Sequence, residues 1–129
     1  MPVHTEIENA LTFADLLMER FGSNITIEID RDESCNFQTL PLSLQLLIEN
    51  AVKHNIVSKS KPLHIQVHCD NNQYLHVSNN YQPKIQAVTS TGVGLDNIQK
   101  RFAYFTDKEV IIEQTDSHFK VSLPLIQPK

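Results

Sequence analysis

Two segments of this 129-residue chain pair an apolar helical pattern with groups suited to hold an anion. At about 100° per residue, the run from Pro41 to His54 gathers its large apolar side chains into one stripe: Leu44, Leu47, Ile48 and Ala51. Further along, a Gly-x-Gly turn opens a second run whose apolar residues also recur at helical spacing: Leu95, Ile98, Phe102 and Phe105. We expect two amphipathic helices that belong to one site.

The polar side of the first helix is a candidate binding surface. It carries Glu49, Asn50, Lys53 and His54. Because Asn50 and Lys53 lie three residues apart, an amide oxygen that can ligate Mg²⁺ and an ammonium that can pair with phosphate point into the same space. For this helix taken alone, a solvated face with a Glu49/Lys53 pair is the simpler explanation.

The glycines of the second segment add to this pattern. Gly92 and Gly94 remove side chains where backbone N–H groups would approach an anion at a helix N-terminus. A lone Gly-x-Gly is typical of a tight turn, but its combination with an upstream Asn-Ala-x-Lys helix and two intervening strand-like stretches is more specific. The two segments together predict a phosphate-binding site.

The remaining pattern predicts an α/β sandwich with its helices on one face of the sheet. A first helix with apolar residues at helical spacing ends at Phe21, where Gly22 supplies a stop. Five stretches have the character of strands: residues 24–30, 63–68, 74–78, 110–115 and 119–123. The second and third should form a hairpin around Asp70-Asn71-Asn72, and residues 81–91 should form a loop.

Composition narrows the class of protein. The length suits a single domain over residues 1–129, and a net charge of -4 provides no basic stripe for nucleic acid or an anionic membrane. No apolar stretch approaches the roughly 20 residues of a membrane span, and the acidic start is unlike a signal peptide, so we expect a soluble domain. Cys35 and Cys69 form no Cys-x-x-Cys pair and are interpreted as passive thiols of a reducing cytoplasm.

Three histidines should share the polar face of the central hairpin: His64, His68 and His76. Such a trio could bind a soft divalent metal. Histidines that simply face solvent from a strand are the simpler explanation.

The two segments carry a family resemblance. Residues 49–54, Glu-Asn-Ala-Val-Lys-His, resemble the N box of the GHKL ATP-binding domains, and Gly92-Val93-Gly94-Leu95 resembles their second glycine box. The pattern is most similar to the catalytic domain of LytS-type sensor histidine kinases, and the resemblance covers nearly the whole chain. It implies the Bergerat fold, a two-layer α/β sandwich with a mixed, mostly antiparallel sheet, in which residues 81–91 form a short ATP lid.

The resemblance also implies roles for individual residues, with ATP and Mg²⁺ as cofactors. Asn50 matches the asparagine that holds Mg²⁺ against the triphosphate, Lys53 the lysine that faces the phosphates, and His54 a ring that borders the nucleotide. Glu49 matches a carboxylate proposed to assist proton removal from the acceptor histidine. The nucleotide-binding set is completed by Asn79, Gly92, Gly94 and Leu95.

The chain departs from the family pattern at three places. Leu46 stands where the ATP-hydrolysing members carry the general-base glutamate, which favours phosphoryl transfer over hydrolysis. Residues 79–83, Asn-Asn-Tyr-Gln-Pro, replace the Asp-x-Gly-x-Gly of the first glycine box, so Asn79 would offer adenine a neutral acceptor in place of a carboxylate. Lys120 stands where many relatives have a threonine near adenine.

The resemblance implies a cytoplasmic catalytic domain of a membrane-anchored bacterial kinase. None of the six histidines has the His-Phe-x-Phe-Asn context of the family's acceptor, so the γ-phosphate would pass to a histidine on the dimerisation helices of the parent kinase and then to a response regulator. The alternative is a degenerate domain that binds nucleotide weakly and acts by docking. An anti-sigma-type serine kinase fits Glu49 and His54 less well. We expect a monomer in isolation, with no contact to nucleic acid or membrane.

Overall fold

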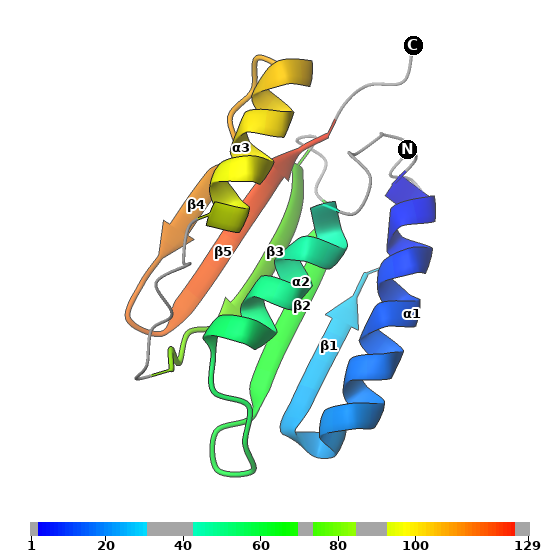
Figure 1. The fold of residues 1–129 in the computed structure, drawn as a ribbon, viewed down its shortest axis with the longest axis vertical. Helices are drawn as coiled ribbons and strands as arrows, with labels where there is room; N and C mark the ends of the chain where they lie inside the picture. Colours follow the sequence, from blue (N-terminus) through cyan, green and yellow to red (C-terminus); the bar gives the residue numbers. More distant parts are fainter. Residues whose placement is uncertain (1–2, 31–42, 70–73, 85–92, 126–129) are drawn as a thin grey trace.

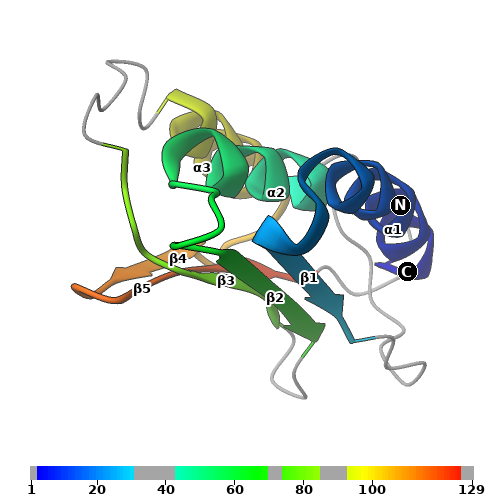
Figure 2. The same ribbon diagram turned by 90° about the horizontal axis from the view of Figure 1, so that it is seen from below.

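The computed structural model describes residues 3–30, 43–69, 74–84 and 93–125 of the chain. Its helices and strands follow in the order α1 (Val3–Phe21), a 3-10 turn (Gly22–Asn24), β1 (Ile25–Ile29), α2 (Ser43–His54), β2 (Leu63–Cys69), β3 (Tyr74–Asn80), α3 (Val93–Phe105), β4 (Ile111–Gln114) and β5 (His118–Pro124). The three helices form one layer and the five strands the other (Figures 1 and 2).

The strands form a single mixed sheet in the order β1-β2-β3-β5-β4. β1 and β2 are parallel, and α2 lies between them in the sequence, in keeping with the crossover connection that a parallel pair needs. The other neighbours pair antiparallel: β2 with β3, β3 with β5, and β5 with β4. The predicted pairing of β2 with β3 is confirmed, although the turn residues 70–72 lie outside the described residues, and the two-layer α/β fold class is confirmed as well.

The core lies between the sheet and the helices, which cover one face of the sheet only (Figure 2). Alternate residues of the central strands point into this core, and they include Leu63, Ile65, Val67, Leu75, Val77, Val121 and Leu123. The predicted stripe of α2 is buried against them in full: Leu44, Leu47, Ile48 and Ala51. Burial of each leucine or isoleucine side chain contributes about 1.5–3 kcal/mol, so this face fixes how α2 lies on the sheet.

Local sequence determines where the helices end. α1 ends at Phe21 as predicted, and Gly22 follows with a φ of 63°, a left-handed conformation that costs glycine little. On α3, Ile98 and Phe102 are buried, but Phe105 is 61% exposed. Phe105 belongs to α3, as its helical spacing predicts, but as the last residue of the helix it does not join the buried stripe.

The cysteines also differ from the expectation. Cys69, partly buried at the end of β2, is disulfide-bonded. The second cysteine of the chain, Cys35, lies outside the described residues. The interpretation of Cys69 as a passive thiol is wrong, and the cysteines give no support for a reducing compartment.

Candidate functional site

The polar side of α2 is accessible in the folded chain. α2 lies between α1 and α3 in the helical layer (Figure 1), and its apolar stripe faces the sheet. On the other side, Glu49 and Lys53 are exposed, whereas Asn50 and His54 are half-buried. The structure therefore keeps the four predicted side chains on one helix face, with the amide held more deeply than the ammonium.

The end of α2 is basic. The peptide N–H of Lys84 donates to the carbonyl of His54 at 3.1 Å, so the lysine after β3 lies directly opposite the last helical residue. Burial lowers the pKa of His54 from its ordinary value of 6.5, and the charges of Lys53 and then Lys84 lower the pKa further. The lowered pKa favours the neutral form of His54 in the folded chain.

A side chain that sequence reasoning missed ties the chain after β3 to α2. The Gln82 amide donates to the carbonyls of Ile56 and Lys61, both at 2.7 Å, and the Gln82 peptide N–H donates to Asn55 Oδ1 at 2.8 Å. Asn55 is 4% exposed and anchors itself by donating to the carbonyl of Ala51 at 2.9 Å. We call this network, formed by Asn55, Asn80 and Gln82, the amide clamp.

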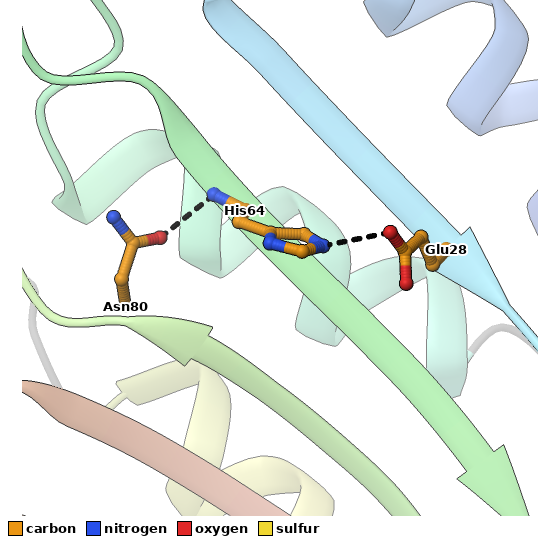
Figure 3. A network of polar contacts seen from close by, with 3 residues as sticks. All are labelled: Glu28, His64 and Asn80. Carbon is orange, nitrogen blue, oxygen red and sulfur yellow. Dashed lines mark hydrogen bonds and ion pairs between the residues drawn. The ribbon is translucent and has the colours of Figure 1, made fainter.

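The third member of the amide clamp, Asn80, connects it to the sheet. Asn80 Nδ2 donates to Gln82 Oε1 at 3.1 Å and to the carbonyl of Pro62 at 3.1 Å. Its Oδ1 accepts the peptide N–H of His64 at 2.7 Å, a contact drawn in Figure 3. The residues that replace the first glycine box are therefore engaged within the protein.

Asn79, the expected adenine acceptor, lies on the helix-covered face of β3. It is 4% exposed, pairs in register with Ile65 and Phe119, and donates from Nδ2 to the carbonyl of Asn80 at 2.8 Å. Next to it the rings of Tyr81 and Phe119 stack with centroids 6.2 Å apart. The amide is thus held among apolar neighbours, with one of its N–H groups donated to the Asn80 carbonyl.

Lys120 does not lie where the sequence comparison suggested. It pairs in register with Ser78, whereas the residues that face the helices from β5 are its neighbours Phe119 and Val121. Since side chains alternate across a strand, Lys120 belongs to the open face of the sheet. Phe119 is the residue of β5 that lies beside Asn79.

The second glycine segment is described in part. Gly94 lies in the first turn of α3, and Gly92 is outside the described residues. Leu95 is half-buried and packs against the core, so its side chain anchors the start of α3. α3 contacts α2, and the first turn of α3 lies closer to α2 than its last turn does (Figure 1). Of the predicted lid, residues 81–84 are held by the amide clamp, and residues 85–91 lie outside the description.

The three histidines share the open face of the sheet, as predicted. His64 Nε2 lies 3.2 Å from Glu28 Oε1 (Figure 3), the rings of His68 and His76 lie 4.8 Å apart, and His76 Nδ1 lies 2.7 Å from Ser122 Oγ. Within the described ranges, no three metal-ligating side chains of the His, Cys, Asp and Glu types come together. These contacts link neighbouring strands.

Three proteins of known sequence are similar to this chain. It is 28% identical to the sensor protein LytS of Enterococcus faecalis, over 98% of this chain and 25% of that protein. It is 29% identical to LytS of Staphylococcus haemolyticus, over 91% of this chain and 23% of that protein. It is 32% identical to YwpD of Bacillus subtilis, over 81% of this chain and 42% of that protein. The chain is homologous to the LytS sensor proteins. It spans less than half the length of each of these curated relatives. No protein-family model matches it.

Solved structures of histidine kinases share the fold of this chain. The nucleotide-free catalytic domain of the histidine kinase ThkA superimposes with a TM-score of 0.66 at 15% identity, over 99% of this chain and 97% of that one. The histidine kinase domain of the Erythrobacter litoralis blue-light-activated kinase EL346 superimposes with a TM-score of 0.55 at 11% identity, over 90% of this chain and 59% of that one. This LytS homologue thus has the fold of histidine kinase catalytic domains. None of its helices, in the described ranges, is long and apolar enough to cross a membrane.

Proposed function

We propose that this chain is the ATP-binding catalytic domain of a LytS-like sensor histidine kinase. It binds Mg-ATP and transfers the γ-phosphoryl group to an imidazole nitrogen of a histidine on another segment or subunit, with ADP as the leaving group. A response-regulator aspartate then receives the phosphoryl group. The observation that carries the proposal is the accessible polar face of α2, with Asn50 and Lys53 side by side, in a chain homologous to LytS.

The proposed roles follow the chemistry of the side chains. The Asn50 amide oxygen ligates Mg²⁺, and the Lys53 ammonium pairs with the phosphates. Glu49, exposed one residue earlier, takes the proton from the acceptor imidazole. Phosphoryl transfer has a loose transition state, so positioning and charge neutralisation do most of the catalysis. His54, Asn79 and the start of α3 with Gly92, Gly94 and Leu95 complete the nucleotide site.

Leu46 supports transfer over hydrolysis. It lies one helical turn before Asn50 and is 38% exposed on the accessible side of α2. A leucine at this position can neither orient nor deprotonate a water molecule, whereas a general base contributes about 10²–10⁴-fold to such a reaction. The phosphoryl group is therefore kept for a docked side chain.

The proposal is tested by phosphorylation of a separate fragment that carries the acceptor-histidine helices of the parent kinase. Asn50→Asp and Lys53→Ala should each abolish transfer from labelled ATP. Asn9→Asp and Lys59→Ala, which change exposed residues of the same type away from this helix face, should leave it intact. Unchanged transfer in the Asn50 and Lys53 variants would contradict the site assignment.

A docking module is the second candidate, and the amide clamp is the observation that favours it. Side chains engaged within the protein at residues 79–82 replace groups that would face a nucleotide. Such a domain would bind the dimerisation helices of its own kinase or a regulator without nucleotide. Equal affinity for the dimerisation helices with and without Mg-ATP would favour docking, and nucleotide-dependent affinity would favour the kinase.

A further inference from the structure

A short antiparallel bridge joins the end of α2 to the chain that leaves β3. Asn55 and Pro83 are bridge partners. On either side of them, the peptide N–H of Ile56 donates to the carbonyl of Gln82 at 2.8 Å and that of Lys84 donates to the carbonyl of His54 at 3.1 Å. Two segments far apart in sequence are thereby held in register, with Lys84 across from His54.

The amide clamp reinforces this bridge from the side. The Gln82 side chain bonds the carbonyls of Ile56 and Lys61, and its peptide N–H bonds the buried Asn55 amide. Several such bonds acting together fix the backbone just before Lys84. The position of Lys84 is therefore set before any ligand binds, which lowers the entropic cost of using it.

The bridge concentrates positive charge at one end of α2. Lys53 and Lys84 flank His54, and both are exposed. Neither makes an ion pair with a residue that the structure describes. The acidic side chain nearest in sequence on the same helix is Glu49, one turn before Lys53. Two lysines held close together repel each other, and an anion between them would relieve that repulsion.

We propose that Lys84 is a further phosphate-binding residue, which contacts the polyphosphate from the strand side while Lys53 contacts it from α2. This inference rests on the proposed function of the site. It gives this role to a side-chain ammonium that directly follows residues 79–83, which replace the glycine-rich turn of the GHKL pattern. The ligand would then be selected by its polyphosphate charge more than by its base.

The test compares Lys84→Gln with Lys59→Gln, which removes the same charge from an exposed residue outside the bridge. Calorimetry with a non-hydrolysable Mg-ATP analogue, inorganic triphosphate and adenosine measures the three affinities. Lys84→Gln should weaken the analogue and triphosphate about tenfold, as for one charge-assisted contact, and leave adenosine unchanged. Lys84→Arg should restore most of the loss. Equal affinities in Lys84→Gln and Lys59→Gln would overturn the inference.

Two further readouts separate this inference from the proposed function. If the wild-type chain binds the analogue and Lys84→Gln has no effect, the function stands and the role of Lys84 falls. If the wild type binds neither the analogue nor triphosphate, both fall. NMR titration checks the position directly, because Lys84→Gln should raise the pKa of His54. An unchanged His54 pKa would contradict the placement of Lys84.

Discussion

The two sides of the candidate site use their polar groups in opposite ways. On α2, Asn50 and Lys53 remain accessible, and the helix is held by the apolar residues of its other face. At the end of β3, Asn79, Asn80 and Gln82 bond neighbouring backbone and amide groups. On a helix, one face can pack against the core while the opposite face binds a ligand. At the end of β3, where no glycine is present, the side chains themselves form the hydrogen bonds that hold the turn.

The largest expected difference between the two sides is in ligand affinity. Lys53→Ala should weaken the Mg-ATP analogue by about 10–100-fold, since it removes a charge-assisted contact worth about 1.5–3 kcal/mol. Asn80→Ala, on the β3 side, should reduce affinity far less because its bonds are made within the protein. Calorimetric titration measures both, and a greater loss for Asn80→Ala would reverse the comparison.

The amide clamp should show itself in stability. Gln82→Ala should lower the free energy of unfolding by about 1–3 kcal/mol, because the carbonyls of Ile56 and Lys61 lose their donor. Gln66→Ala, which truncates an exposed glutamine of β2, should change it by no more than about 0.5 kcal/mol. Urea denaturation followed by circular dichroism gives both values. Equal small effects would mean that the clamp contributes little.

Restoring an aspartate at position 79 sharpens the comparison. Asn79→Asp should cost about 1–2 kcal/mol of stability, because it removes the donor to the Asn80 carbonyl and places a carboxylate at a site that is 4% exposed. Asn97→Asp on the exposed side of α3 is the matched control. Thermal unfolding without nucleotide measures the difference, and a stabilised Asn79→Asp variant would show that the β3 side accepts a carboxylate.

The smallest effect is a pH dependence from His54. Because the folded chain lowers the pKa of His54 below its ordinary 6.5, the unfolded chain binds the proton more readily. Stability should therefore fall as the pH falls from about 7 through 6.5 to the folded pKa, and this contribution should stay constant below that pKa. The difference in the free energy of unfolding between wild type and His54→Gln, measured by denaturation across this pH range, isolates the contribution of His54. A wild-type slope of opposite sign would contradict it.

Sequence alone predicted the elements that depend on periodicity. The α2 stripe is one such case, since Leu44, Leu47, Ile48 and Ala51 recur at helical spacing and are all buried. The β2–β3 hairpin is another, because alternation and a polar turn specify both strands and their pairing. Local rules of this kind also located the end of α1 at Gly22.

The parts that sequence reasoning missed depend on contacts between distant segments. Asn55 and Gln82 lie 27 residues apart and meet only because α2 and β3 end at the same place. The density of amide side chains in residues 79–82 was a usable signal, but it does not name the partners. Lys120 was placed near adenine by the family resemblance alone, whereas the alternation of Phe119 and Val121 in the sequence already predicts that it lies on the other face of the sheet. The disulfide of Cys69 has no local pattern at all.

The central claim is that α2 holds a triphosphate through Asn50, and one measurement tests it most directly. Calorimetric titration of the chain with a non-hydrolysable ATP analogue, with and without Mg²⁺, should show Mg²⁺-dependent binding in the micromolar to submillimolar range that Asn50→Ala removes. Asn97→Ala should bind as the wild type does. Absence of binding to the wild-type chain, or binding that survives Asn50→Ala, would contradict the account and favour the docking module.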